Sequence, residues 1–109
     1  MSTFGDAGLA AYAASKHGVA GLTKCLASEL GEFGITANFI QPGAILTDIT
    51  RDSIEKHPEM EVFWRQKSAL GRWGEPTDIA PVALFLASDL GAFVSGTGLV
   101  ADGAAMQAP

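Results

Sequence analysis

The most regular apolar pattern in this sequence lies in residues 11–31 and predicts a helix. Val19, Leu22, Leu26 and Leu30 follow one another at intervals of three and four residues. This spacing puts their side chains on one face of a helix and leaves the opposite face to polar residues. The helix is expected to stop at the glycines that follow its last leucine.

Two short apolar runs predict strands over residues 35–41 and 96–102. The first, "ITANFIQ", is rich in β-branched and aromatic residues, and Pro42-Gly43 follows it directly. This composition is typical of a buried strand that ends at a turn. The second run, "GTGLVAD", has the same character near the end of the chain.

A second amphipathic helix is expected over residues 75–88. It opens with "EPTD", which places a proline in the first turn and an acidic residue near the helix N-terminus. Both features favour helix initiation. Its apolar face is formed by residues at intervals of three, one and three, namely Ile79, Val82, Ala83 and Leu86.

The remaining segments are less regular. Residues 1–10 are small and contain glycine, and they predict a loop. Residues 44–74 form a long mixed stretch that predicts one or two short helices broken at Pro58. A connection of this length inside a small domain is usually functional.

The order helix, strand, helices, strand predicts an α/β fold with two parallel strands, because a strand–helix–strand unit is a parallel crossover. Two strands make a poor sheet on their own. We therefore expect residues 1–109 to form a single partial domain. Its incomplete sheet would be completed by oligomerisation or by residues that this sequence lacks.

Composition narrows the function classes. The chain has 109 residues, is 48% hydrophobic and 17% charged, and carries a net charge of −5. No basic stripe is present, which argues against nucleic-acid binding. No signal peptide and no run of membrane-spanning length is found, so we expect a cytoplasmic protein without membrane contact. The single cysteine, Cys25, is expected in a buried helix position, and the isolated His17 and His57 predict no metal site.

Tyr12 and Lys16 are the chemically suggestive pair. They lie four residues apart at the start of the predicted helix, and therefore on one face of it. An ammonium beside a phenol favours proton exchange with an alcohol or carbonyl near neutral pH. The alternative for this pair taken alone is a tyrosine that packs by its ring beside a solvated lysine.

The surrounding sequence changes this balance. "YAASK" resembles the YxxxK signature of the short-chain dehydrogenase/reductase family, and "GLTKCLASELGEFGITANFIQPG" continues the match in register. "GRWGEPTDIAPVALFLASD" is similar to the family's R-x-G-x-P-x-D-I-A segment, and "FVSGTGLVADGA" to its closing strand and Asp-Gly-Gly end. The resemblance implies the C-terminal portion of a Rossmann-like doubly wound fold.

The resemblance also implies roles. Tyr12 would be the general acid/base, and Lys16 would support it and hold the nicotinamide ribose of NAD or NADP. Residues Pro42, Gly43, Ala44 and Ile45 would lie along the nicotinamide, and Thr47 would bond its amide or the pyrophosphate. An alternative for Thr47 is that it caps the next helix, since "TDIT" suits a helix start.

The same resemblance assigns the other variable and closing segments. Residues 48–68 would form the substrate lid, with Phe63 and Trp64 as wall residues. Asn38 would be a strand position, and Asp102-Gly103 would close the sheet near a subunit interface. For the two aromatic residues, a place in the core or in an interface is the alternative.

Two parts of the family's site are absent from these 109 residues. No G-x-x-x-G-x-G turn occurs, and no serine stands about thirteen residues before Tyr12. The expected function is nonetheless hydride transfer between NAD(P) and a small alcohol or carbonyl. One alternative is a non-catalytic remnant that self-associates through its two major helices. A more distant one is a cofactor-independent hydrolase or dehalogenase that uses Ser15 or His17.

Overall fold

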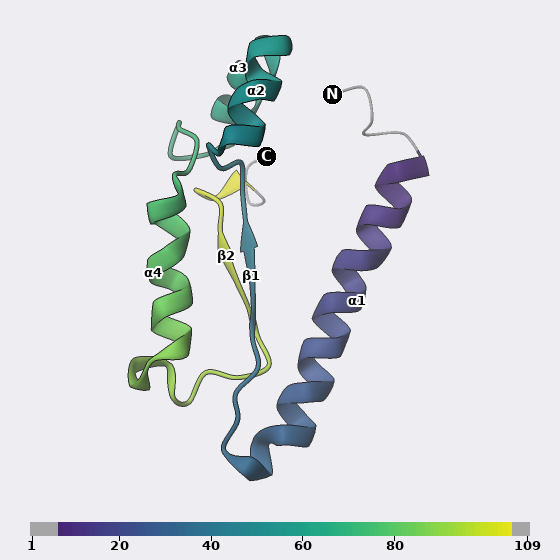
Figure 1. The fold of residues 1–109 in the computed structure, drawn as a ribbon, viewed down its shortest axis with the longest axis vertical. Helices are drawn as coiled ribbons and strands as arrows, with labels where there is room; N and C mark the ends of the chain where they lie inside the picture. The colour runs from purple at the N-terminus through teal and green to yellow at the C-terminus, as the bar shows by residue number, and fades with distance from the viewer. Residues whose placement is uncertain (1–6, 106–109) are drawn as a thin grey trace.

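The computed structural model describes residues 7–105, which form four α-helices, two short 3-10 helices and two strands (Figure 1). The described elements, in chain order, are α1 (Ala7–Leu30), η2 (Gly31–Phe33), β1 (Phe39–Pro42), α2 (Asp48–Lys56), α3 (Glu59–Lys67), α4 (Pro76–Ala87), η3 (Asp89–Gly91) and β2 (Gly98–Ala101).

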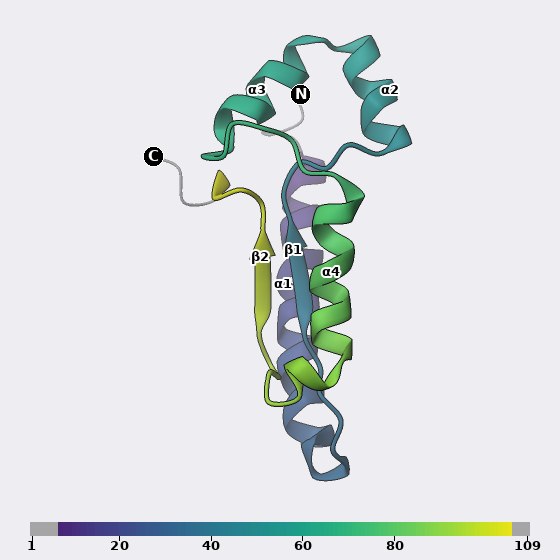
Figure 2. The same cartoon turned by 90° about the vertical axis from the view of Figure 1, so that its left-hand side faces the viewer.

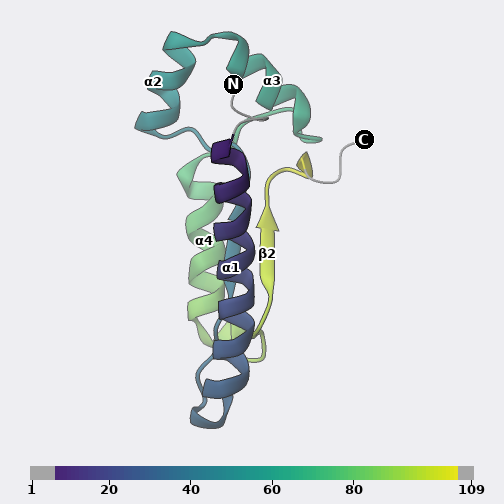
Figure 3. The same ribbon diagram turned by 90° about the vertical axis from the view of Figure 1, so that its right-hand side faces the viewer.

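The two strands lie parallel, as the order of elements predicts. Their register pairs Phe39 with Gly98 and Pro42 with Ala101. Helix α1 covers one face of this small sheet and α4 covers the other (Figures 2 and 3). Helices α2 and α3 lie beyond the carboxyl ends of both strands (Figure 1). The architecture is therefore an α/β arrangement of three layers with a helical cap over one end.

Helix α1 begins earlier than its apolar spacing predicts. It starts at Ala7 rather than at residue 11, so the predicted loop over 1–10 is wrong for residues 7–10. Alanine and leucine favour helix and carry the first turn without an apolar stripe. Residues 1–6 of that loop lie outside the described residues. The helix ends at Leu30, and Gly34 closes the following turn with a φ of 74°.

Strand β1 is shorter than the predicted 35–41 and includes the proline that was expected to end it. Asn38 stops it on the amino side, because its side chain donates to the Val94 carbonyl at 2.9 Å and accepts from the Thr97 amide at 3.2 Å. The Phe39 amide donates to the Thr97 carbonyl just before β2, and the Gly43 amide donates to the Ala101 carbonyl in β2. Alternate residues face alternate edges, so the missing N–H of Pro42 falls on the edge away from β2, where it costs no ladder bond.

The long segment over 44–74 contains two helices, α2 and α3, which are separated at His57-Pro58. Strand β2 occupies Gly98–Ala101 rather than the whole predicted range of 96–102. Helix α4 runs from Pro76 to Ala87, and Glu75 is its N-cap.

Little apolar surface is buried within the chain. Trp73, at 7% exposure, is the one large hydrophobic residue that is buried among the residues described, whereas Leu22 and Leu84 are 60% and 69% exposed. The chain exposes 7617 Å², against about 5,700 Å² for a typical folded monomer of this mass. Its radius of gyration is 16.0 Å, against roughly 13 Å for a compact domain. Much of the apolar face of α1 is therefore open, whereas Ile79, Val82 and Leu86 of α4 are partly covered.

The exposure of the α1 surface also explains the exposure of Cys25. The sequence predicts a buried position, but Cys25 is exposed in the chain. The spacing locates an apolar face on the helix correctly but cannot say whether another element covers that face. Among the described residues, no helix combines the length and the apolar character that a membrane span requires.

Candidate functional site

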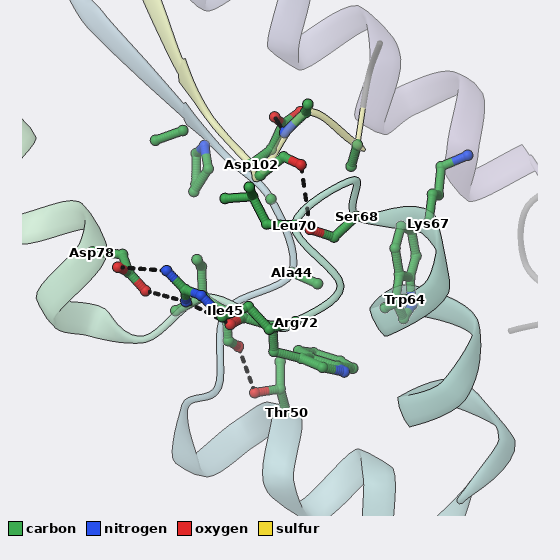
Figure 4. Close-up of a pocket in the computed structure, with 18 of the residues that line it drawn as sticks. Ala44, Ile45, Thr50, Trp64, Lys67, Ser68, Leu70, Arg72, Asp78 and Asp102 are labelled. Atoms are coloured by element: carbon green, nitrogen blue, oxygen red, sulfur yellow. Dashed lines mark hydrogen bonds and ion pairs between the residues drawn. The ribbon is translucent and has the colours of Figure 1, made fainter. Parts of the chain in front are cut away.

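A pocket of about 890 Å³ opens where the two strands end. Its floor is the chain that leaves β1, and its walls come from α3, from the segment before α4 and from the turn after β2 (Figure 4). Ligands of open α/β sheets bind outside the carboxyl ends of the strands. The position of this cavity in the fold is therefore that of a binding site.

The floor is built from residues 42–45, and each of these residues lines the pocket. The Gly43 amide donates to the Ala101 carbonyl at 3.1 Å, which holds the floor to β2. A Cβ at Gly43 would stand 2.7 Å from the Cβ of Asp102. Only glycine fits here, and the exposed backbone beside it gives a ligand close access to the main chain.

Tyr12 lines the same pocket although it comes from a different element. It lies near the start of α1, whose N-terminal half stands away from the sheet (Figure 1), and its side chain is 55% exposed. The Lys16 ammonium lies 5.3 Å from the centre of the Tyr12 ring. The pair therefore shares one helix face, as the spacing predicts. Lys16 itself is not among the residues that line the pocket.

Thr47 acts as the N-cap of α2. Its hydroxyl accepts from the Thr50 amide at 3.3 Å, and the Thr50 hydroxyl accepts from the Thr47 amide at 2.7 Å. The Thr50 hydroxyl also donates to the Ile45 carbonyl at 2.7 Å. Thr50 lines the pocket and Thr47 does not. Capping, the structural alternative for Thr47, is therefore what its hydroxyl does in this structure.

The two aromatic residues expected at the lid wall separate. Trp64 lines the pocket, as Figure 4 shows, whereas Phe63 is 51% exposed outside it. Their rings pack edge to face with centroids 5.0 Å apart. Successive residues of a helix point in different directions, so α3 presents only one of the two to the cavity.

Ser15 and His17 make local bonds to their own helix. The Ser15 hydroxyl donates to the Tyr12 carbonyl at 2.8 Å, and His17 Nδ1 lies 2.9 Å from the Ala13 carbonyl. No nucleophile–base contact joins the two side chains in the hydrogen bonds of the described part of the chain. Within residues 7–105, no group of three or more His, Cys, Asp and Glu side chains has an arrangement that could hold a metal ion.

The sequence pattern placed Asp78 at the start of a helix but assigned neither Arg72 nor Asp78 to the site. Arg72 bonds Asp78 twice, from Nη1 at 2.9 Å and from Nη2 at 3.2 Å (Figure 4). These bonds hold the pKa of Asp78 down, chiefly through the Arg72 hydrogen bond and then through the Glu75 amide, to about 2. Both residues line the pocket. The available signal was the opposite charge of two residues six apart, on either side of the Gly74-Glu75-Pro76 stretch.

Trp73 and Ser68 join this segment and α3 to the rest of the fold. The Trp73 indole is 7% exposed and donates to the Glu61 carbonyl at 3.0 Å. Ser68 is also 7% exposed, and its hydroxyl donates to the Gly103 carbonyl at 3.3 Å. The end of the helical cap formed by α3 is therefore tied to the segment before α4 and to the turn after β2.

The turn after β2 contains a departure from the Asp-Gly-Gly pattern. Asp102 accepts from the Ala104 amide at 2.8 Å, which closes the turn. Gly103 has a φ of 63°, and Ala104 has a φ of 68°. Alanine is strained in this left-handed region, where glycine is not. The third position of the pattern therefore has a backbone conformation that favours the missing glycine.

Comparisons with known proteins agree with this architecture. The family model described as enoyl-(acyl carrier protein) reductase matches residues 2–104. The chain is 40% identical over 92 residues to an L-rhamnose 1-dehydrogenase (NAD(P)(+)) of Sphingomonas sp., covering 84% of this chain and 36% of that protein.

Two solved structures are similar in fold and sequence. A short-chain type dehydrogenase/reductase from Mycobacterium ulcerans superposes with a TM-score of 0.83 and 36% identity, over 90% of this chain and 35% of that one. A 4-hydroxyisoleucine dehydrogenase complexed with NADH gives a TM-score of 0.79 and 38% identity, over 86% and 38%. The chain thus spans little more than a third of the length of these proteins. With a family match over nearly its whole length and this shared fold, the chain belongs to the short-chain dehydrogenase/reductase family.

Proposed function

We propose that this chain carries the proton-transfer part of an oxidoreductase that moves a hydride between NAD(P) and a small alcohol or carbonyl compound. One observation carries the proposal. Tyr12, from the far end of α1, lines the same pocket as the backbone of residues 42–45 at the carboxyl end of β1. A phenol above an open stretch of backbone, beyond the ends of parallel strands, suits a substrate bound against a flat cofactor ring.

In this proposal the side chains have separate tasks. Tyr12 exchanges a proton with the substrate oxygen, and Lys16, on the same helix face, would support this exchange and hold the ribose hydroxyls. Pro42, Gly43 and Ile45 bound the nicotinamide side of the pocket. The bound cofactor supplies or accepts the hydride. Thr47 serves the cofactor through its hydroxyl only if that hydroxyl can donate while it caps α2.

The described residues fit one end of the cofactor. The glycine floor gives the close backbone access that a planar ring needs, and the pocket has room for it, at about 890 Å³. The pyrophosphate end needs a Gly-rich turn at a helix N-terminus. These 109 residues contain no such turn and no serine at the family's spacing. The proposed reaction therefore requires those groups from outside this sequence.

The substrate class is bounded by the relatives rather than by the pocket. One relative is named for a sugar and another for a hydroxylated amino acid, and both are dehydrogenases. A hydroxyl group on carbon, or the corresponding carbonyl, is what these two names share. The lid helices α2 and α3 line the variable side of the pocket, and they are the segment expected to choose the substrate.

The test begins with cofactor binding. The full chain is titrated with NADH and with NADPH by calorimetry, and saturable binding supports the proposal. A screen of alcohols with NAD(P) then compares Tyr12→Phe, which removes one hydroxyl, with Ser15→Ala, which removes another hydroxyl from the same helix. We expect turnover to fall at least about 100-fold in the first variant and to be kept in the second. Equal turnover in Tyr12→Phe and the unchanged chain would rule out the assigned role of Tyr12.

The open helix faces support a second candidate, a non-catalytic protein that self-associates. Val19 and Leu22 on α1 and Leu84 on α4 are 49–69% exposed, and large exposed apolar patches mark interaction sites. Light scattering of the chain should then give a defined oligomer, and Leu22→Glu should dissociate it. A monomer with a cooperative melt would contradict this candidate. Cofactor binding separates it from the first.

A further inference from the structure

The segment from Arg72 to Asp78 closes on itself through a dense set of bonds. Besides its two bonds to Asp78, Arg72 Nη1 donates to the Trp73 carbonyl at 3.0 Å. Asp78 Oδ2 accepts in turn from the Glu75 amide at 2.7 Å. The ion pair therefore holds the backbone of the intervening residues in one conformation, and Gly74 lies in the middle of it.

Gly74 is in direct contact with the pocket floor. Its amide donates to the Ala44 carbonyl at 2.8 Å, and its carbonyl accepts from the Leu46 amide at 2.9 Å. These two bonds form a one-residue parallel bridge at Ile45, beyond the end of β1. The Thr50 hydroxyl also holds this stretch, because it donates to the Ile45 carbonyl at 2.7 Å. Residues 44–46 are thus positioned by Gly74 on one side and by Thr50 of α2 on the other.

We infer that Arg72 and Asp78 are positioning residues. Their ion pair fixes Gly74, and Gly74 in turn helps to hold residues 44–46, which include the Ala44-Ile45 end of the floor. The inference rests on the proposed oxidoreductase function. In this inference the two side chains act by positioning the backbone, and neither of them contacts a ligand. Three of the five N–H donors of Arg72 already bond Asp78 and the Trp73 carbonyl, so most of its hydrogen-bonding capacity is used within the segment.

The same segment also holds the lid. Trp73 follows Arg72 directly and is the best-buried large hydrophobic residue described, and its indole bonds the Glu61 carbonyl in α3. One closed segment therefore sets both the floor and one wall of the cavity. A small rotation of this segment would move the two together, and misplacement of about 1 Å can cost roughly 100-fold in rate.

The first measurement is amide hydrogen exchange in the full chain. Asp78→Asn should raise the exchange rates of the Gly74 and Leu46 amides about tenfold or more. Without the ion pair, the backbone of Gly74 is held less firmly against residues 44–46, so both of these hydrogen bonds should open more often. The Gly43 amide, which bonds β2 rather than Gly74, should change by less than about threefold. Asp78→Glu keeps the carboxylate and should recover most of the protection.

The matched control is Arg65→Met. Arg65 pairs with Glu61 at 2.8 Å on the exposed side of α3 and contacts no floor residue. This variant should leave the Gly74 and Leu46 amides protected. Uniform loss of protection in Asp78→Asn, or an absence of protection at Gly74 and Leu46 in the unchanged chain, would overturn the inference.

The second measurement is kinetic, with a substrate found in the screen. Asp78→Asn and Arg72→Lys should lower kcat tenfold or more while KM for the substrate changes less than threefold. If Arg72 bound the substrate instead, KM would rise with kcat kept, and the inference would be wrong. If neither the unchanged chain nor the chain supplied with the missing Gly-rich turn and serine has turnover, the proposed function fails, and hydrogen exchange still decides whether the pair positions the floor.

Discussion

Gly43 and Asp102 meet where the two strands end, so closely that a Cβ on Gly43 would stand 2.7 Å from the Cβ of Asp102. This contact brings the floor of the pocket against the turn that closes β2. It joins two residues that are far apart in the sequence, and the shape of the cavity depends on it.

Gly43→Ala should therefore destabilise the chain by about 1–3 kcal/mol, because the added methyl forces the two strand ends apart. Denaturant unfolding measures the change. Gly18→Ala is the matched control, since Gly18 lies in α1 with no atom within 4 Å of an added Cβ. It should stabilise by about 0.5–1 kcal/mol. A neutral effect of Gly43→Ala would contradict the close approach.

Ala104→Gly should stabilise the chain, since Ala104 has a φ of 68°. The left-handed region costs a non-glycine residue about 1–2 kcal/mol, part of which is offset by the larger freedom of glycine in the unfolded state. We expect a net gain of about 1 kcal/mol in the free energy of unfolding. Ala83→Gly, at an exposed interior position of α4, should instead lose about 1 kcal/mol. Equal signs in the two variants would refute the strain.

Asn38→Ala should loosen the junction between β1 and β2. The side chain bonds the Val94 carbonyl and the Thr97 amide, and so joins residues 56 and 59 positions away. Loss of two partly buried bonds should cost about 1–3 kcal/mol in unfolding free energy. Ser95→Ala removes one exposed bond to the Ala37 amide and should cost less than about 1 kcal/mol. A larger loss in the serine variant would argue against the junction.

The Arg72–Asp78 pair predicts an acid-dependent stability. The pKa of Asp78 is lowered from 3.8 to about 2, first by the Arg72 hydrogen bond. Because the folded-state pKa lies below the unfolded one, the ionised carboxylate stabilises the fold above about pH 4. That contribution is lost as the pH falls from about 4 towards 2.

Carbon-13 NMR of the Asp78 carboxyl should place its midpoint near 2. In Arg72→Met the pKa of Asp78 should move up towards its ordinary value, since the largest cause of the shift is removed. Arg65→Met should leave the midpoint unchanged. If the midpoint of Asp78 were the same in Arg72→Met as in the unchanged chain, the hydrogen bond from the Glu75 amide would account for the lowered pKa, and Arg72 would not.

Local patterns predicted the elements because their causes are local. The three-and-four spacing over 11–31 located α1, and the "EPTD" start located α4, since helix faces and caps depend on neighbours in sequence. The boundaries moved where long-range contacts intervened. Asn38 cut the strand short from the amino side, and β2 offered only Gly98–Ala101 as partner.

The burial of Cys25 was wrongly predicted for a related reason. An amphipathic stripe shows that a helix face is suited to contact with other apolar groups. It contains no information on whether this chain supplies those groups, and here Val19 and Leu22 on the α1 face stay exposed.

The sequence by itself determined the candidate residues: Tyr12 and Lys16 one helical turn apart, and a Pro-Gly step after a predicted strand. Only the tertiary structure decided how they meet. It placed Tyr12 and the floor at one cavity, and it made Thr47 the N-cap of α2. It also brought Arg72 and Asp78 together in an ion pair on either side of Gly74. The reason is physical: a spacing fixes neighbours along one element, whereas a site requires elements that the chain brings together only by folding.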